Sequence, residues 1–357
     1  MKPFSAHVAV TGLNATDNPG PGVAVARALR QDSSFNGKII GLAYDVMDPG
    51  IYHSGLFDAC FLIPYPSAGR EALFERLAYI QQQVGIDVLI PNLDSELPAL
   101  LGQESRLEAL GIRTFLPTRE AYDRRTKARL DELREQHGVA VPQSQTLTDV
   151  TPLYTMAGSL HFPLAVKGVF YGAEICHSLD EAVAAFYKAA ATWGLPIIVQ
   201  EFVPGEEFNV CAVGDGTGAL VGAVAMKKLV LTDKGKGWAG VTIQDPRLTQ
   251  LAAQVVAALK WRGPCEIEAK LHPQKGYQLL EVNPRFPAWC YLTAGAGQNQ
   301  ISAVARLAAG ESLAPLPAAR VGTTFIRISL DQIVELSQLE AISTRGEILP
   351  EALLETA

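Results

Sequence analysis

The chain has 357 residues, 48% of them hydrophobic, and a formal net charge of −7. This length allows more than one hydrophobic core and suggests two or three domains. A net negative charge without a dense Lys/Arg block argues against nucleic acid and anionic membranes as partners, so small molecules are the expected partners.

Targeting and redox signals are absent from the pattern. No apolar stretch reaches the roughly 18 residues needed to span a bilayer, and residues 1–7 lack a signal-peptide core. The five cysteines are scattered, without the spacing of a zinc site or a disulfide framework. We therefore expect a cytoplasmic protein that does not interact with membranes.

Residues 7 to about 115 alternate between strand and helix patterns. Such alternation predicts a parallel sheet covered by helices. The expected strands are residues 7–12, 38–44 and 87–91, and the expected helices are residues 22–30 and 70–84.

The glycines after the first strand do not match a dinucleotide-binding turn. Seven residues separate Gly12 from Gly20, whereas that turn is tight because its backbone touches a pyrophosphate. Pro19 and Pro21 also remove amide donors. This spacing argues against binding of nicotinamide or flavin.

A charged, helix-forming stretch at residues 119–137 ends at Gly138 and predicts a domain boundary near residue 117. Further along, Ser178 and Glu181 form a capping box, and Asp245 caps another helix. The expected strands that follow the boundary are residues 164–167, 197–203, 208–213, 219–226 and 323–329.

The pattern of residues 265–285 has side chains suited to a magnesium nucleotide. Residues 278–283 read as a strand in which Glu281 and Asn283 share one face and Leu280 and Val282 face the core. Residues 265–271 would pair with it as a hairpin and place Glu268 opposite Glu281. Any one of these residues alone would be read as a solvent-side residue of a hairpin, but the joint pattern favours a magnesium site.

Four features in chain order resemble the ATP-grasp superfamily, in its branch of carbamoyl-phosphate synthases and carboxylate-amine ligases. They are Lys167 at a strand end, the apolar strand that ends in residues 200–207, the basic loop at Lys227 and Lys228, and the cluster of Glu268, Glu281 and Asn283. The run Glu-Val-Asn-Pro-Arg at residues 281–285 is the most specific piece.

The resemblance implies an α/β fold, α+β in its catalytic part. It implies a Rossmann-like parallel-sheet domain at residues 1–117, a small ATP-grasp lobe at 118–200, a large lobe with the Mg-ATP site at 201–330 and a tail at 331–357.

The resemblance also implies roles for single residues in binding ATP. Lys167 is similar to the lysine that reaches the α- and β-phosphates, and Lys127 is similar to a second phosphate lysine, or is a solvated helix charge. Glu207, with Glu206 as the alternative, would accept hydrogen bonds from the ribose. The segment whose backbone would read the adenine comprises Gln200, Glu201, Phe202 and Val203.

Magnesium would be held by Glu268, Glu281 and Asn283, with Glu281 bridging two ions and Mn²⁺ as an alternative metal. Arg285 would steady the γ-phosphate or the substrate carboxylate, and Lys228 would join it as a catalytic cation.

Two segments depart from the family pattern. Residues 168–173 contain only two glycines where the family has a glycine-rich flap over the phosphates. Aromatic residues follow Arg285 at residues 286–291, and they would either line a pocket for an apolar or peptide-like substrate or pack in the core.

The implied activity is that of an ATP-dependent ligase, which phosphorylates a carboxylate to an acyl phosphate and joins it to an amine or peptide nucleophile. The alternatives are activation of bicarbonate, which the short segment after residue 310 disfavours, and a nucleotide-binding regulator without turnover. A homodimer is the default expectation for the assembly. The candidates for the substrate pocket are Asn14, Asp17, Asp94, Glu96 and Arg285, although Asp94 and Glu96 would equally serve to cap the next helix.

Overall fold

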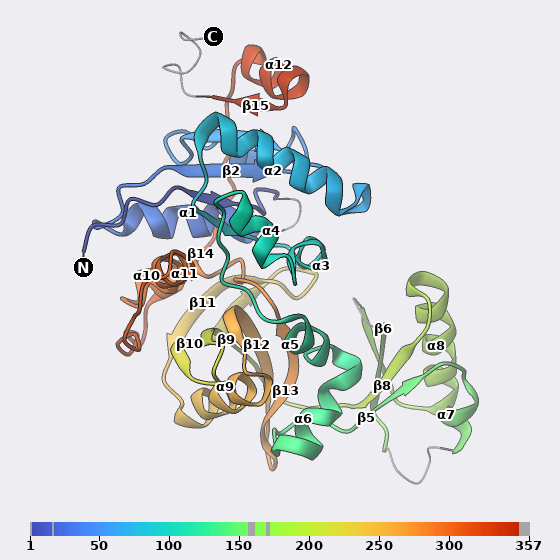
Figure 1. Cartoon of the computed structure of the whole chain (residues 1–357). Coiled ribbons are helices and arrows are strands. Elements are labelled where there is room, and N and C mark those ends of the chain that lie inside the picture. Colours follow the sequence, from blue (N-terminus) through green and yellow to red (C-terminus); the bar gives the residue numbers. More distant parts are fainter. Residues whose placement is uncertain (1, 16–17, 156–160, 169–171, 350–357) are drawn as a thin grey trace.

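The computed structural model describes residues 2–15, 18–155, 161–168 and 172–349, and these form three sheets (Figure 1). Along the chain, an N-terminal sheet is followed by a four-stranded antiparallel sheet and then by a six-stranded antiparallel sheet. The expected α/β fold class is confirmed by this arrangement.

The N-terminal sheet has the order β15-β3-β2-β1-β4. Its four parallel strands are β1 (Val8–Val10), β2 (Ile39–Ala43), β3 (Ala59–Leu62) and β4 (Val88–Ile90). Strand β3 was not predicted, and the fifth strand, β15 (Glu347–Ile348), arrives from the far end of the chain and pairs antiparallel with β3.

Two predicted helices cover the two faces of this sheet. Apolar residues of α1 (Pro21–Gln31) pack with Val8 and Val10, whereas those of α2 (Arg70–Val84) pack with Ala9 and Ile40. Neighbouring residues of a strand face opposite sides, so the two helices lie on opposite faces. Shorter helical segments complete the region: η1 (Pro49–Tyr52), η2 (Pro66–Ala68), α3 (Leu97–Leu100) and α4 (Glu104–Ala109).

The single helix expected at residues 119–137 is wrong. The segment is divided into α5 (Arg119–Arg124), η3 (Lys127–Arg129) and α6 (Leu130–His137), because Thr126 takes an extended conformation with φ −61° and ψ 144°. The end at Gly138 is confirmed, since this glycine has the left-handed conformation (φ 66°) that favours a residue without a side chain.

The small sheet has the order β5-β8-β6-β7 and one covering helix, α8 (Leu179–Trp193). Ser178 caps α8 by accepting a hydrogen bond from the Glu181 amide, as the capping box predicts. The Glu181 carboxylate accepts from the amide of His177. The remaining elements are β5 (Ser144–Leu147), α7 (Thr151–Thr155), β6 (Leu164–Gly168), β7 (Ala173–Cys176) and β8 (Ile197–Glu201).

The large sheet has the order β13-β12-β9-β10-β11-β14. One face packs on α9 (Pro246–Leu259) and α6. Its strands are β9 (Glu207–Asp215), β10 (Leu220–Leu231), β11 (Gly237–Ile243), β12 (Arg262–His272), β13 (Gly276–Asn283) and β14 (Thr324–Ile326).

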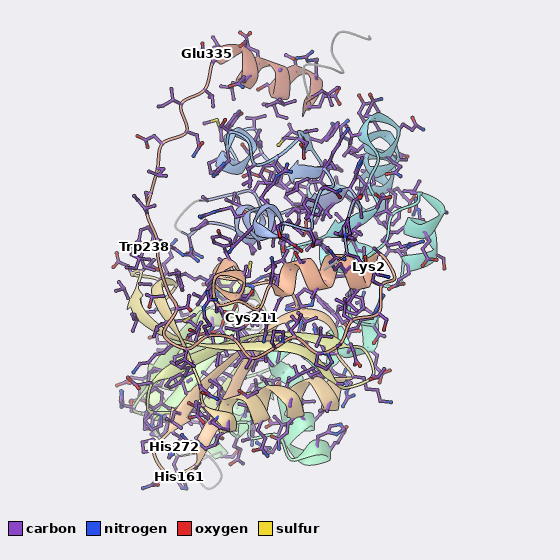
Figure 2. All side chains as sticks on the ribbon, turned by 90° about the vertical axis from the view of Figure 1, so that its left-hand side faces the viewer. Lys2, His161, Cys211, Trp238, His272 and Glu335 are labelled. Carbon is purple, nitrogen blue, oxygen red and sulfur yellow. The ribbon has the colours of Figure 1, made fainter. Side chains whose placement is uncertain are left out.

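The opposite face of the large sheet shares a core with the N-terminal sheet. Cys211, labelled in Figure 2, packs there with apolar residues of α1, α10 (Tyr291–Gly295) and α11 (Gln300–Ala308). Outside the shared core, residues of β9, β10, β12 and β13 carry the polar side chains described below.

The domain boundaries near residues 117, 200 and 330 remain predictions. Residues 130–141 contribute to the core beneath the large sheet, and α12 (Leu336–Arg345) with β15 joins the N-terminal sheet. Across the described residues, no helix combines the length and the apolar character required to cross a membrane.

Candidate functional site

The predicted carboxylates meet across the β12–β13 hairpin. Glu268 lies directly opposite Glu281, as expected, and Asn283 lies opposite Glu266. The prediction that Leu280 faces the core is wrong, because a β-bulge at this point leaves Leu280 half-buried, and the core residues are Leu279 and Val282.

Glu266 is a buried carboxylate that the sequence reasoning missed. It accepts hydrogen bonds from Asn209 Nδ2 (2.9 Å), Trp289 Nε1 (2.7 Å) and Asn283 Nδ2 (3.3 Å). Because alternate residues of a strand share a face, the position of Glu266 two residues before Glu268 was the available signal.

The carboxylate cluster needs positive charge. Burial raises the pKa of Glu268 to about 8, and the nearby carboxylates Glu266 and Glu281 add to this rise, while Lys228 opposes it. A buried carboxylate, Glu266, and a half-buried one, Glu268, on the same strand are costly unless cations balance them. The site therefore favours binding of a cation.

Two lysines from separate elements reach this cluster. Lys127 Nζ, on η3, lies 3.0 Å from Glu281 Oε1, and Lys167 Nζ, on β6, donates to Gln200 Oε1 at 2.6 Å. Burial, together with the positive charge of Lys127, lowers the pKa of Lys167 to about 8. The break at Thr126 that ends α5 thus places Lys127 beside Glu281 and not on a solvated helix face.

Lys228 lies within strand β10 and not in the expected loop. Its ammonium contacts the carboxylate of Glu207, the first residue of β9, while the neighbouring Lys227 pairs with Glu206. Burial by itself lowers the pKa of Lys228, but Glu268 and Glu207 raise it above its usual value. Glu207, and not Glu206, is therefore connected to the cluster.

The rest of the expected adenine-reading segment lies at the end of β8. The Gln200 side chain is buried against Lys167, whereas Glu201 forms an ion pair with Lys275. The Phe202 ring lies 5.3 Å from Lys270 Nζ, and Val203 is buried.

Arg285 connects the cluster to the N-terminal domain. Its Nε lies 3.3 Å from Asp94 Oδ2, and its Nη1 lies 3.5 Å from Glu266 Oε2. Burial opposes the charge, but Asp94 and Glu266 raise the pKa of Arg285 above its usual value.

The other substrate-pocket candidates differ in their surroundings. Asp94 and Glu96 do not cap the next helix, because Asp94 pairs with Arg285, and Glu96 is buried and accepts from the amides of Asn92 and Leu93. Asn14 Oδ1 is buried without a hydrogen-bond partner among the described residues, and Asp17 lies outside them.

Arg327 is a second residue that the sequence reasoning missed. It is inward-facing next to β14, and its guanidinium contacts the Asn18 side chain. Burial lowers its pKa to about 10, and among the described residues no carboxylate forms an ion pair with it. Its signal in the sequence was a lone charge within the apolar run at residues 325–328.

The aromatic residues after Arg285 pack in the core. Phe286 and Trp289 are buried in the cluster shared with the N-terminal sheet. Of the two alternatives predicted for residues 286–291, core packing is the one that these two side chains follow. The glycine-poor flap at residues 168–173 lies partly outside the described residues.

The donors in this cluster suit a hard metal ion. Glu268, Glu281 and Asn283 offer side-chain oxygens, and Asn209 Oδ1, on the neighbouring strand, is buried without a hydrogen-bond partner in the described structure. Oxygen donors of this kind are those that Mg²⁺ prefers. Within the described residues, no three His, Cys, Asp or Glu side chains are grouped as a metal site by themselves, so the predicted ligand set remains a prediction.

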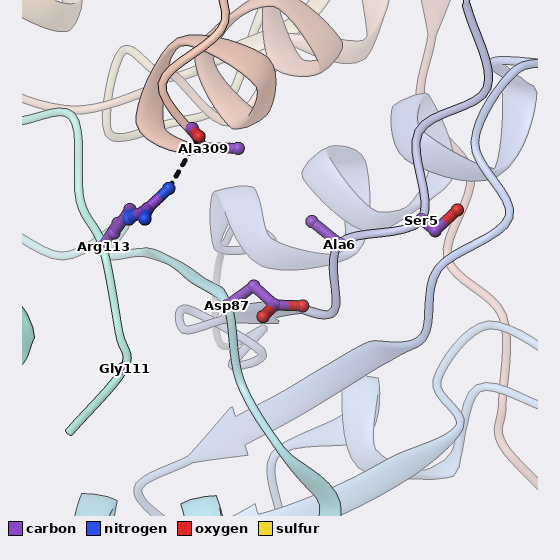
Figure 3. A pocket seen from close by; sticks show the side chains of 6 residues that line it. All are labelled: Ser5, Ala6, Asp87, Gly111, Arg113 and Ala309. Carbon is purple, nitrogen blue, oxygen red and sulfur yellow. Dashed lines mark hydrogen bonds between the residues drawn. The ribbon is translucent and has the colours of Figure 1, made fainter.

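A pocket of the N-terminal domain lies away from this cluster (Figure 3). It has a volume of about 420 Å³ and is lined by Ser5, Ala6, Asp87, Gly111, Arg113 and Ala309. Arg113 closes one side by donating to the carbonyl of Ala309 at 2.8 Å. None of the predicted site residues lines this pocket.

Comparison with known proteins identifies the fold and a domain family within the chain. Residues 195–329 match the family model described as ATP-grasp in the biosynthetic pathway with Ter operon. A phosphoribosylamine–glycine ligase from Synechocystis sp. is 27% identical over 214 residues, which are 54% of this chain and 51% of that protein. A D-alanine–D-alanine ligase B from Pseudomonas syringae pv. tomato is 28% identical over 170 residues, 44% of this chain and 53% of that protein.

The chain spans about half the length of these curated relatives. Among solved structures, the biotin carboxylase of Campylobacter jejuni, a β-γ-ATP complex, superposes with a TM-score of 0.69 at 15% identity, over 90% of this chain and 74% of that one. The matched family model shows an ATP-grasp domain at residues 195–329, the two ligases are similar to the chain in sequence, and the solved structure shares its fold.

Proposed function

We propose that the chain is an ATP-dependent ligase that activates a small-molecule carboxylate and couples it to an amine, in an amino acid or a peptide. The observation that carries this proposal is the convergence of Glu268, Glu281 and Asn283 on one sheet face, next to Lys127 and Lys167 from two other elements. An acidic cluster facing lysines suits a nucleotide whose phosphates carry a divalent metal.

In this proposal the nucleotide lies between the small sheet and the large sheet. Lys167 and Lys127 would neutralise phosphate oxygens, Glu207 would accept from the ribose, and the backbone of residues 200–203 would bind the adenine. Glu268, Glu281 and Asn283 would hold Mg²⁺, or Mn²⁺ in its place. Such an ion supplies charge neutralisation at the transferring phosphoryl group.

The acceptor carboxylate would lie near two guanidinium groups. Arg285 is held by Asp94 and Glu266, whereas Arg327 is half-buried and has no carboxylate partner among the described residues. A partly desolvated arginine of this kind favours an anionic ligand. We therefore assign Arg327 to the acceptor carboxylate and Arg285 to the transferred phosphoryl group, with Lys228 stabilising the charge on it.

The chemistry then proceeds in two displacements. An oxygen of the carboxylate attacks the γ-phosphorus, the bond from that phosphorus to the β-γ bridging oxygen breaks, and ADP leaves. The amine nitrogen next attacks the acyl carbon and loses a proton, and phosphate leaves. No enzyme nucleophile is needed, so the side chains act by positioning and by neutralising charge.

The test is ADP release from Mg-ATP with hydroxylamine present to trap the acyl phosphate. Pools of amino acids, dicarboxylates and short peptides would be compared for the wild type, Glu281→Gln and the matched control Glu71→Gln, whose carboxylate pairs with Arg106 in the N-terminal domain. We expect carboxylate-dependent ADP and hydroxamate in the wild type and the control, and a loss of at least about 100-fold in Glu281→Gln.

Other outcomes would favour the alternatives. ADP release that depends on bicarbonate alone would replace the amine ligase with a bicarbonate-activating enzyme. ATP binding without turnover in any pool would favour a nucleotide-binding regulator, and the absence of ATP binding would contradict the proposal as a whole.

A further inference from the structure

The segment that follows β14 is extended and unusually apolar on its surface. Ile326, Ile328 and Leu330 are 77%, 75% and 70% exposed. Figure 2 shows the chain running along the outside of the molecule between the level of Trp238 and Glu335. Exposed apolar side chains at alternate positions of an extended segment are typical of an interaction surface.

Strand β14 is the last strand of the large sheet, so one of its edges is open. The amide of Arg327 donates to the Trp238 carbonyl, and Thr323 accepts from the amide of Thr242, so odd-numbered residues form hydrogen bonds with β11. In an antiparallel ladder the alternate residues point their N–H and C=O groups the other way. Thr324, Ile326 and Ile328 therefore point their backbone N–H and C=O groups away from β11. No described strand pairs with these outward groups.

Three features that commonly protect edge strands are absent from this open edge. They are a lysine, a proline and a bulge. The residues at even positions from 324 to 332 are Thr, Ile, Ile, Leu and Gln. None of them is charged, and none is a proline.

The apolar surface also extends from the edge onto the sheet. Val230 and Ile326 are both opposite Ala239 on β11, and they are 51% and 77% exposed. Leu231, 55% exposed, lies opposite Gly237. Because Ala239 and Gly237 are small, the exposed side chains on either side of β11 can be covered by one flat partner surface.

We propose that two copies of this chain associate through this edge, with residues 324–332 pairing antiparallel across a two-fold axis at Ile328. In that register Ile328 lies opposite its own equivalent, and Ile326 lies opposite Leu330 of the other copy. The pairs Ile328–Ile328 and Ile326–Leu330 join apolar side chains, and the backbone groups of Ile326 and Ile328 point outward, so hydrogen bonding and side-chain matching select the same register.

The partner at this edge is a second copy of the chain, because residues 324–332 are complementary to the same residues of another copy. An isologous two-fold interface requires one patch to match its own copy, and the uncharged row from Thr324 to Gln332 does so without opposing like charges. Pairing also closes both open edges at once, which joins the two large sheets into one. The proposal does not depend on the ligase activity.

The first test is sedimentation velocity of the full chain over a concentration series. We expect a dimer for the wild type and a dissociation constant at least about 100-fold higher for Ile328→Lys, which places two lysines directly opposite each other. Met47→Lys is the matched control, since Met47 is 68% exposed on the N-terminal domain and should leave the dimer intact.

The second test is cross-linking, which remains informative if a lysine variant misfolds. All five native cysteines are buried. We expect Ile328→Cys to form an intermolecular disulfide under copper-phenanthroline oxidation, because directly opposite residues have Cα atoms about 5.5 Å apart. Ile333→Cys, at a position 92% exposed, should cross-link more slowly, since residue 333 would lie opposite Thr323.

Three results would overturn the proposal. They are a wild type that is monomeric at every concentration, a dimer that Ile328→Lys leaves unchanged, and equally fast cross-linking of the two cysteine variants. ADP and hydroxamate formation, measured on the same samples, would separate a failure of this interface from a failure of the proposed ligase.

Discussion

At the scale of single residues, the cations of the site contact oxygen atoms of the protein itself. Lys127 contacts Glu281, Lys167 contacts Gln200, and Arg285 contacts Glu266. These contacts limit the cost of burying the charges. Binding of a nucleotide with its metal would exchange these partners for phosphate oxygens and for the metal.

Lys167 makes this exchange dependent on pH. Its pKa is lowered to about 8 by burial, so the ammonium that binds phosphate is lost as the pH rises through 8. We expect ATP affinity, measured by isothermal titration calorimetry, to fall by up to about tenfold per pH unit above that value.

Lys167→Arg should flatten this pH profile, because a guanidinium keeps its charge. Lys188→Arg is the matched control, since Lys188 is an exposed lysine paired with Glu174, and it should keep the wild-type profile. A wild-type affinity that is constant across pH 8 would contradict the assignment of Lys167 to the phosphates.

At the scale of elements, helix α9 and hairpin β12–β13 are joined by one carboxylate. Asp245 caps α9 by accepting from the Arg247 amide at 2.9 Å, and it also accepts from the Tyr277 hydroxyl at 3.0 Å. Asp245 therefore links the helix that packs on the large sheet to the strand that carries Glu281.

Asp245→Ala should lower the free energy of unfolding by about 1–2 kcal/mol, the usual effect of losing an N-cap. Hydrogen bonds from the Arg247 side chain lower the pKa of Asp245 to about 2. The contribution is therefore complete above the unfolded pKa near 4 and is lost as the pH falls toward 2.

Urea denaturation at neutral pH measures this effect. Asp233→Ala, in the exposed turn between β10 and β11, is the control and should leave the midpoint unchanged. An equal midpoint for Asp245→Ala and the wild type would show that the cap does not stabilise the sheet.

At the scale of the whole molecule, the C-terminal part of the chain stabilises the N-terminal sheet. Strand β15 extends that sheet at β3, and Ile342 of α12 is fully buried in a cluster with Leu13 and Cys60. The same stretch of chain leads away from the open edge of β14, so residues 324–348 connect the large sheet with the first one.

Ile342→Ala should therefore destabilise the N-terminal domain by about 2–4 kcal/mol, the usual effect of a large-to-small change in a core. Thermal denaturation followed by circular dichroism measures the loss. Ile333→Ala, at a position 92% exposed, is the matched control. If both variants melted together with the wild type, the C-terminal segment would contribute no stability to the sheet.

Local patterns in the sequence predicted most elements and the face of β12–β13 that carries the carboxylates. Alternation along a strand depends only on neighbouring residues, so the pairing of Glu268 with Glu281 and the helix at residues 70–84 could be predicted. Four features in chain order, of which the run Glu-Val-Asn-Pro-Arg is the most specific, predicted the resemblance to ATP-grasp proteins, and the family model that matches residues 195–329 is an ATP-grasp model.

Long-range packing decided the rest, because it brings together residues that no local pattern relates. The bulge at Leu280, the break at Thr126 that places Lys127 on Glu281, and the partners of Glu266 all depend on neighbouring elements. Burial of Arg327 and the pairing of β15 with β3 likewise join segments far apart in the chain. The sequence by itself determined the types of side chain in the site, and only the tertiary structure decided their partners, since burial and pairing are properties of the folded chain.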